Sequence, residues 1–257
     1  MSQHKQRVRD TFTRQAETYA NSVVIAADQA RREFVDFVAP RPSERVLDVA
    51  TGPGFLALLF AERAAEATAV DLTEAMLARA VANRAARGLS NVRFVAADAE
   101  RLAFADGSFE CATCGSAFHH FSEPALVLRE MARVTASGGR IALLDIITSE
   151  DTRQAALHNR LERERDPSHV RSLPLSELVR LFEQHGLRRV RTHTYQTRRE
   201  LGEWFAISHT PATAAERIRA EFVASIPGDR TGMQVQQDGE QVGFMHTFAW
   251  IVGVRDG

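Results

Sequence analysis

The chain has 257 residues, 44% of them hydrophobic and 25% charged, and a formal net charge of −1 at pH 7, a composition typical of a globular protein rather than a disordered or fibrous one. A charge so close to zero gives no electrostatic reason to expect nucleic acid or a membrane surface as partner. No apolar stretch approaches the length of a membrane helix, and the polar start carries no secretory signal, so we expect a cytoplasmic protein that acts on a small molecule.

The N-terminal residues 1–40 are expected to form a helical cover over the ligand-binding face. Amphipathic patterns predict two helices in this part, at residues 2–19 and 26–38. Residues 41–257 then form the main domain, which is long enough to bury a sizeable core. No segment shows a sustained heptad seam, so both a monomer and a homodimer remain open.

Strands and helices alternate in the next part of the chain. The expected strands are residues 46–49, 66–71, 91–96, 109–116 and 140–147, and the expected helices are residues 55–65, 75–86 and 123–134. This alternation favours an α/β fold with a doubly wound parallel sheet over a helical bundle or a sandwich.

The C-terminal part is less regular and is expected to carry helical insertions, at about residues 149–175 and 199–227, that form a cap. Its expected helices are residues 148–161, 176–185, 201–208 and 212–225, and its expected strands are an edge strand at 187–197 and a closing strand at 242–254.

A glycine hairpin follows the first expected strand and indicates a nucleotide-like ligand. Asp48 lies near the carboxyl end of that strand, and Gly52 and Gly54 let the backbone approach a ligand without Cβ obstruction. Gly52, Gly54 and Ala57 also satisfy the loose dinucleotide pattern G-x-G-x-x-G/A. The hairpin alone therefore allows either a pyrophosphate or another anionic group.

Four acids at strand ends bear on this choice: Asp48, Asp71, Asp98 and Asp145. An ionised Asp48 so close to the hairpin would oppose a pyrophosphate, whereas it would favour a cofactor with a sulfonium and an ammonium group. Asp71 suits the ribose of either cofactor, Asp98 could cap a helical turn, and Asp145 could be a solvated residue. Together the acids favour the cationic cofactor, and a nicotinamide-dependent oxidoreductase stays as an alternative.

Cys111 and Cys114 form a C-x-x-C pair inside an expected buried strand. Residues three apart on a strand point to opposite faces, and no second cysteine pair exists to complete a zinc site. We therefore expect two core residues and no metal.

Five ordered motifs, VLDVATGPG, AVDLTEAML, AADAERLAF, CGSAFHHF and REMARVTASGG, resemble those of class I S-adenosylmethionine-dependent methyltransferases. The likeness is to the branch related to ubiquinone/menaquinone-biosynthesis C-methyltransferases, and the stretch RERDPSHVR resembles a small-molecule subgroup of that branch. The resemblance implies a Rossmann-like seven-stranded sheet with an antiparallel last strand. It also implies S-adenosyl-L-methionine as cofactor and S-adenosyl-L-homocysteine as product.

The resemblance also implies the cofactor contacts. Asp48 and the Ala50–Gly54 backbone would hold the methionine part, and Asp71 would bind the ribose hydroxyls. Tyr19 resembles a cover residue that closes over the cofactor. The implied cofactor-binding residues are Tyr19, Asp48, Ala50, Gly52, Gly54, Asp71, Leu72, Met76, Asp98, Ala99, Gly115 and Ser116.

Histidines after the fourth strand are candidate bases for an acceptor that carries a proton, such as an enol, phenol, quinol or N-heterocycle. A histidine pKa near 6.5 suits removal of such a proton, and Asp145 could orient the ring. On a strand-like backbone the rings of His119 and His120 would point opposite ways, so only one would face the pocket. Both could instead be structural.

Candidate acceptor-binding residues lie in the two insertions: His169, Arg171, Trp204 and His209. The alternatives are a salt-bridged surface loop for the first pair and helix docking for the second pair. The alternative functions are other chemistry in the same cofactor pocket, such as a cyclisation, and cofactor sensing without chemistry.

Overall fold

The structure is a computed structural model that describes residues 2–256, without the side chains of residues 19–28. The strands are β1 (Arg45–Val49), β2 (Glu66–Asp71), β3 (Val92–Ala96), β4 (Phe109–Gly115), β5 (Thr135–Ile147), β6 (Leu187–Glu200), β7 (Gln236–Asp238) and β8 (Gln241–Arg255). The helices are α1 (Gln3–Val38), α2 (Phe55–Ala61), α3 (Glu74–Arg87), α4 (Pro124–Val134), α5 (Thr152–Arg165), α6 (Leu175–Gln184), α7 (Leu201–Ser208) and α8 (Ala212–Ser225), and a 3-10 turn, η1, spans Phe118–His120.

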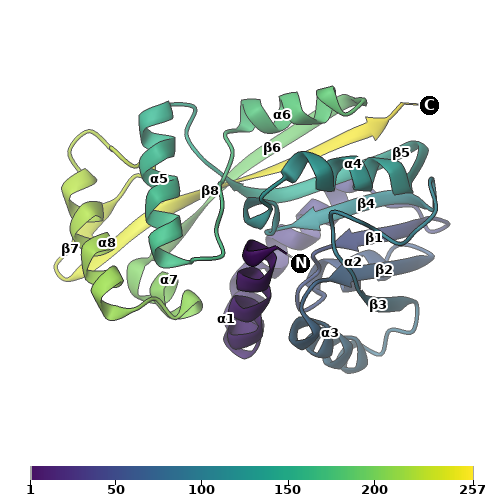
Figure 1. Cartoon of the computed structure of the whole chain (residues 1–257), viewed down its shortest axis with the longest axis horizontal. Coiled ribbons are helices and arrows are strands. Elements are labelled where there is room, and N and C mark those ends of the chain that lie inside the picture. Colours follow the sequence, from purple (N-terminus) through teal and green to yellow (C-terminus); the bar gives the residue numbers. More distant parts are fainter. Residues whose placement is uncertain (1, 257) are drawn as a thin grey trace.

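One mixed sheet carries the fold, in the strand order β3-β2-β1-β4-β5-β8-β6 (Figure 1). The first five strands in this order pair in parallel, and β8 runs antiparallel to both of its neighbours. The predicted Rossmann-like sheet with an antiparallel last strand is confirmed. An eighth strand, β7, was not predicted, and it forms a short hairpin with β8 through the turn at Gly239.

The inner parallel strands β1, β2 and β4 are mostly buried because helices cover both faces of the sheet, whereas the edge strand β3 is largely exposed. Helix α2, with the sequence FLALLFA, is buried at every position, as its wholly apolar sequence requires. Cys111 packs in the core on one face with Phe34 and Phe60, and Cys114 packs in the other core with Met131. Both thiols are free and buried, as predicted for core residues.

Strands β6 and β8 extend beyond the parallel strands, and α5, α7 and α8 gather around their far halves (Figure 1). These elements enclose a core of their own, which includes Leu161, Trp204, Phe222 and Phe244. Helix α5 begins later than predicted because Asp151 caps it, accepting hydrogen bonds from the backbone N–H groups of Arg153 and Gln154.

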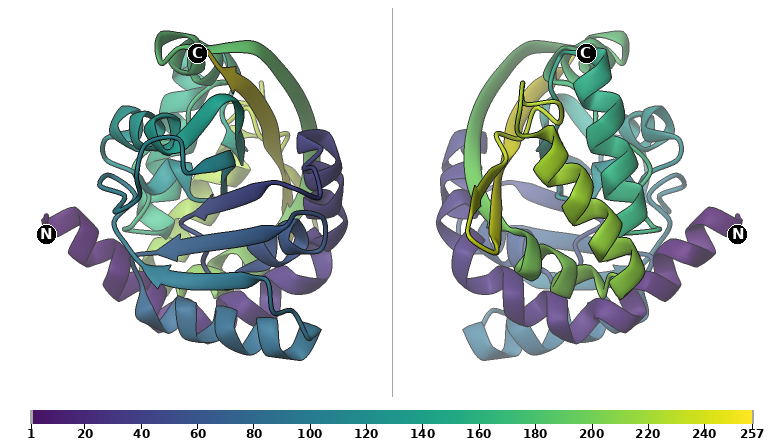
Figure 2. Two further views of the ribbon diagram at one scale, coloured as in Figure 1. Left: turned by 90° about the vertical axis from the view of Figure 1, so that its right-hand side faces the viewer. Right: turned by 90° about the vertical axis from the view of Figure 1, so that its left-hand side faces the viewer.

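The N-terminal segment is one helix, and the prediction of two separate helices was wrong. Asn21 and the β-branched run that follows it are poor helix formers. Packing at both ends of α1 outweighs this propensity: Lys5 reaches Asp98, and Phe34 is fully buried in the core. Figure 2 shows the N-terminal end of α1 on the side to which the arrowheads of the parallel strands point.

None of the helices in the described part of the chain combines the length and apolar character that a membrane crossing requires.

Candidate functional site: two joined cavities

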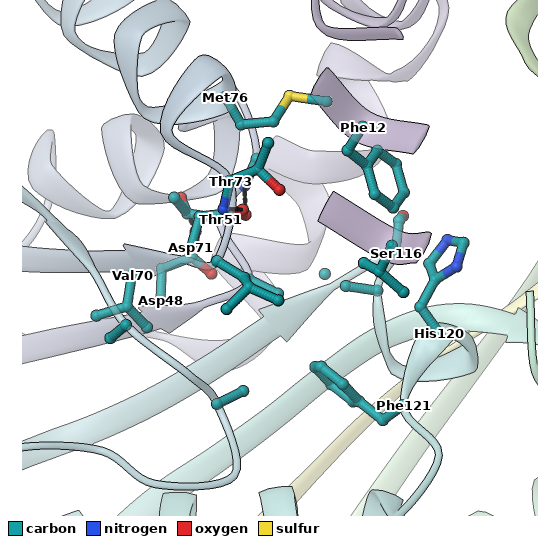
Figure 3. Close-up of a pocket in the computed structure, with 18 of the residues that line it drawn as sticks. Phe12, Asp48, Thr51, Val70, Asp71, Thr73, Met76, Ser116, His120 and Phe121 are labelled. Carbon is teal, nitrogen blue, oxygen red and sulfur yellow. Dashed lines mark hydrogen bonds between the residues drawn. The ribbon is translucent and has the colours of Figure 1, made fainter. Parts of the chain in front are cut away.

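A cavity at the carboxyl ends of β1, β2 and β4, called here the cofactor cavity, gathers the residues predicted to bind the cofactor (Figure 3). Among its lining residues are Asp48, Ala50, Gly52, Asp71, Leu72, Met76, Asp98, Ala99, Gly115 and Ser116. Gly54 does not line the cavity, and Tyr19 lies outside the residues whose side chains are described.

Asp48 is a buried carboxyl at the base of the cofactor cavity. Its oxygens accept hydrogen bonds from the Thr51 hydroxyl at 2.6 Å and from the Thr113 hydroxyl at 2.9 Å. Burial raises the pKa of Asp48 to about 6, because these hydroxyls offset only part of the cost of removing a charge from water. A cationic ligand would lower that cost.

Asp71 holds the glycine hairpin in place. Its two oxygens accept from the backbone N–H of Gly52 and of Thr73, each at 2.8 Å, and burial nevertheless raises the pKa of this carboxyl. A Cβ built at Gly52 would meet nothing within 4 Å, so the hairpin has open space on that side. Within the described residues, no ion pair neutralises Asp48 or Asp71, a charge pattern that fits a sulfonium and an ammonium.

Two residues without glycine's freedom adopt left-handed backbone at this cavity. Ala50 has φ of 54° and Ser116 has φ of 53°, conformations that cost about 1–3 kcal/mol each and concentrate at ligand sites. The Ser116 N–H donates to the Leu144 carbonyl at 2.6 Å, and the N–H of Thr51, next to Ala50, donates to the Val70 carbonyl at 2.9 Å. The sequence motifs did not reveal this strain.

Gly54 and Gly115 permit close packing of helix α2. A Cβ at Gly54 would lie 3.0 Å from the Ala80 Cβ and from the Phe94 ring, and a Cβ at Gly115 would lie 2.2 Å from Leu56. The predicted contact of Gly54 with the cofactor is therefore corrected to a packing role at the start of the helix.

The N-terminal part of helix α1 covers the cofactor cavity beyond the carboxyl ends of the parallel strands. Lys5 forms ion pairs of 2.6 Å with Asp98 and with Glu100, and the His4 ring donates to the carbonyl of His120 at 2.8 Å. Phe12 lies on the same helix and points toward the cavity (Figure 3). The cover was expected, but its contacts through Lys5 were not.

A second cavity adjoins the first and shares part of its wall. The residues that line both are Phe12, Arg31, Ser116, His120 and Leu144. The second cavity is also lined by Gln15, Ala30, His119, Ile146, Arg165, Asp166, Tyr195, Thr197, Arg199, Trp204, Ile207, His246 and Phe248. Its walls thus combine aromatic rings with histidines and arginines.

His119 lines the second cavity and is held there by Asp145. Asp145 Oδ1 lies 2.6 Å from the His119 Nδ1, and Oδ2 accepts from the His119 backbone N–H at 3.0 Å. Burial by itself would lower the pKa of His119, but the facing carboxylate outweighs it and the pKa is raised above 6.5. Because a carboxylate only accepts, Nδ1 carries the proton and Nε2 is the free basic atom.

His120 stands where the two cavities meet. Its Nδ1 donates to the Ser168 carbonyl at 3.0 Å, and burial together with the neighbouring His119 lowers its pKa to about 4. The prediction that the two rings point opposite ways was wrong, because the chain turns into η1 after Ser116 and the ring centroids lie only 4.2 Å apart.

The candidate acceptor-binding residues divide into one that lines the second cavity and three that line neither cavity. Trp204 lines it and is stacked under the Arg165 guanidinium. His169 is buried 5.3 Å from the His119 ring and donates to Asn159. Arg171 pairs with Glu177 on the surface, and His209 is an exposed helix cap. The prediction that these last three residues contact the acceptor is therefore replaced: His169 packs in the interior, Arg171 forms a surface ion pair, and His209 ends a helix at the surface.

Sequence reasoning missed the residues that complete the second cavity. Arg31, Tyr195, Arg199 and Phe248 come from α1, β6 and β8, which meet only through the fold. The only sequence signal for these residues was the alternation of side chains between the two faces of the last strands, and this alternation does not indicate which face contacts a ligand.

Comparisons with known proteins agree with this geometry. A family model described as a methyltransferase domain matches residues 47–143. The uncharacterised methyltransferase YcgJ of Bacillus subtilis is 32% identical over 246 residues, which cover 95% of this chain and 97% of that protein. Its crystal structure superposes with a TM-score of 0.84 at 30% identity, covering 89% of this chain and 99% of that one.

A second relative matches over a shorter part of the chain. The demethylmenaquinone methyltransferase of Thermus thermophilus is 44% identical over 117 residues, 45% of this chain and 53% of that protein.

Proposed function

The chain belongs to the class I S-adenosylmethionine-dependent methyltransferases, and from this premise we propose that it methylates a small planar molecule bound in the second cavity. The proposed acceptors are enols, phenols, quinols and N-heterocycles, which carry a proton that must leave as the methyl group is bound. The cofactor, when bound, supplies an electrophilic methyl group on a sulfonium.

The proposed cofactor contacts follow from the charges of the cofactor cavity. Asp48 faces the cationic end, and Asp71, fixed by Gly52 and Thr73, accepts hydrogen bonds from the ribose hydroxyls. Lys5 donates to the Asp98 Oδ2, and the Asp98 Oδ1 accepts from the Glu100 backbone N–H at 3.0 Å. A carboxylate oxygen can accept more than one hydrogen bond, so Oδ1 can also accept from the adenine amine. Met76 packs beside the adenine.

The observation that carries the acceptor chemistry is the His119–Asp145 pair at the wall of a cavity that joins the cofactor cavity. We assign the His119 Nε2 as the base that takes the acceptor's proton, and Asp145 as the residue that holds its tautomer. A base of this kind contributes about 10²- to 10⁴-fold to the rate. Methyl transfer also needs the reacting atoms at about 3–3.5 Å and in line, which is a matter of holding the acceptor.

The second cavity suits a planar acceptor because aromatic rings form much of its wall. Tyr195 and Phe248 are stacked with ring centroids 5.2 Å apart, and Trp204 lies across the same cavity. The partial similarity to a demethylmenaquinone methyltransferase supports an acceptor of quinol type.

The test is methyl transfer from radiolabelled S-adenosylmethionine to a panel of phenols, quinols and N-heterocycles. We expect at least one class to be labelled, and the rate to fall by about 10²-fold or more in His119→Gln. His193→Gln, at an exposed histidine on β6, is the matched control and should keep the wild-type rate. Full turnover in His119→Gln would refute the assignment of the base, and a panel with no labelled member would refute the proposed acceptor class.

A further inference from the structure

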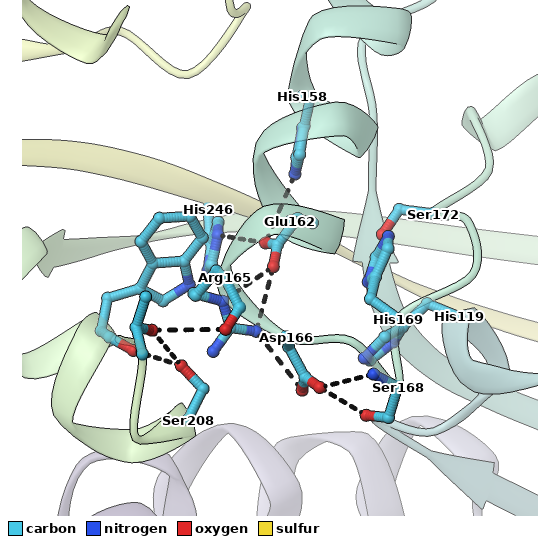
Figure 4. A network of polar contacts seen from close by, with 12 residues as sticks. His119, His158, Glu162, Arg165, Asp166, Ser168, His169, Ser172, Ser208 and His246 are labelled. Carbon is cyan, nitrogen blue, oxygen red and sulfur yellow. Dashed lines mark hydrogen bonds and ion pairs between the residues drawn. The ribbon is translucent and has the colours of Figure 1, made fainter. Parts of the chain in front are cut away.

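Three potential ligand atoms converge inside the cap, apart from the methyl-transfer residues (Figure 4). They are the Nε2 atoms of His158 and His246 and the Oε1 atom of Glu162, and all lie within 4.8 Å of one another. His158 and Glu162 are one turn apart on α5, and His246 comes from β8. The figure shows both rings directed at the same carboxylate.

The three atoms are buried and none of them makes a hydrogen bond of regular geometry in the described structure, although each histidine Nε2 lies within ion-pair distance of the Glu162 Oε1. The side chains are 3%, 1% and 4% exposed for His158, Glu162 and His246 respectively. Leaving a buried polar atom unpaired costs about 1–3 kcal/mol. An ion bound by all three atoms would remove this cost.

Two of the three separations are close to those of ligands around one ion. Two ligands each about 2.1 Å from a tetrahedral ion lie about 3.4 Å apart. Glu162 Oε1 is 3.2 Å from the His246 Nε2 and 3.7 Å from the His158 Nε2, values on either side of that distance.

Arg165 fixes the carboxylate in the orientation that this arrangement needs. Its guanidinium donates to Glu162 Oε2 at 3.0 Å, which leaves Oε1 for the two rings. Outer contacts of this kind orient the direct ligands in metal sites. Asp166, 4.0 Å from the same guanidinium, reduces the positive charge that an ion would meet.

We propose that His158, Glu162 and His246 bind a first-row divalent transition-metal ion. Two imidazoles and one carboxylate suit zinc, iron, cobalt or nickel, whereas magnesium and calcium prefer oxygen ligands alone. Three protein ligands leave further coordination positions open. His246 also lines the second cavity, so the ion would lie at the wall of that cavity.

The sequence offered no recognised metal motif, since His246 is far from the other two ligands along the chain.

The test uses the full chain, freed of any affinity tag and of bound metal by dialysis against a chelator. Co²⁺ is then titrated in and followed by its visible absorption, and Zn²⁺ is added in competition. We expect one Co²⁺ per chain, displaced by Zn²⁺, and an increase in the unfolding temperature on binding. This readout does not involve methyl transfer, so it can fail or succeed independently of the proposed function.

Two variants test the ligands separately. His246→Gln and His158→Gln should each weaken Co²⁺ binding by about 100-fold or more, since even outer contacts cost 10- to 100-fold. His193→Gln should bind as wild type, and circular dichroism checks that every variant is folded. Absence of Co²⁺ and Zn²⁺ binding by the wild type, or binding that survives both variants, would overturn the proposal.

Discussion

Replacing Asp145 by Asn tests how much of the activity depends on the orientation of the His119 ring, because the variant keeps His119 and changes only the residue that holds it. Asp145 accepts three hydrogen bonds: Oδ1 from the His119 Nδ1 at 2.6 Å and from the Ile146 N–H at 2.7 Å, and Oδ2 from the His119 N–H at 3.0 Å. An asparagine has only one accepting oxygen. Its amide NH₂ must therefore face at least one of these donors, and an NH₂ that faces the His119 Nδ1 would require the other tautomer of the ring.

The same change alters the pKa of His119 in a predictable direction. Burial lowers the pKa of this ring, and the facing carboxylate reverses the shift and raises it above 6.5. Without the carboxylate the lowering by burial is unopposed. We expect the rate at the pH plateau to fall by about 10²- to 10⁴-fold, and the rising limb of the pH profile to move to lower pH.

The assay is the pH dependence of kcat/KM for an acceptor whose own pKa lies well above the range measured. In the wild type the activity should rise with pH through the raised pKa of His119, because only the neutral ring accepts a proton. A variant with the wild-type plateau and the wild-type limb would refute the assignment of Asp145 and of His119.

Unfolding by urea gives a second readout that does not require an acceptor. A raised histidine pKa stabilises the fold fully below the unfolded pKa near 6.5, and this stabilisation is lost as the pH rises through the folded pKa. The wild type should therefore lose this contribution as the pH rises from below 6.5 through the raised pKa of His119, and Asp145→Asn should not show that loss.

Three further predictions address the cofactor cavity and the core. Asp48→Asn should raise the unfolding free energy of the ligand-free protein at pH 8 by about 1–3 kcal/mol, because the pKa of about 6 shows that the buried charge is costly there. Calorimetry should also show weaker S-adenosylmethionine binding by this variant. A variant that binds as tightly as the wild type would contradict the role of Asp48. Gly115→Ala should destabilise by about 1–3 kcal/mol through its contact with Leu56, and in a urea-unfolding double-mutant cycle Leu56→Ala should recover part of that loss, whereas strict additivity would count against the contact. Cys111 and Cys114 should resist a thiol reagent in the native protein and both react in guanidinium, because they are buried and burial raises the pKa of Cys111 to about 12; rapid native labelling would contradict their place in the core.

The cofactor side of the molecule was predictable because its residues are close together in the sequence. Asp48, Gly52 and Asp71 lie at the ends of two adjacent strands, where strand patterns and turn residues locate them directly. The local sequence pattern is therefore enough to predict where these residues lie, with little information from the rest of the fold.

The acceptor side and the cap were less predictable, because they depend on contacts between distant segments. The direction of the His119 and His120 rings depends on the turn η1 after β4, which alternation along a strand does not anticipate. His246 joins His158 only because β8 lies beside α5, a relation that no local pattern contains. The unbroken α1 likewise reflects packing at its two ends rather than the preferences of the residues between them.

The position of α1 couples the binding and release of the cofactor to the binding and release of the acceptor. Phe12 and Arg31, near opposite ends of this helix, each border both cavities, and Lys5 fastens the first turns to Asp98 and Glu100. A displacement of α1 that lets the spent cofactor leave the cofactor cavity would also open the second cavity, because the same helix lines both. Release of the spent cofactor and of the methylated acceptor would then require the same movement of α1. Salt weakens ion pairs at a partly exposed site and would speed that movement.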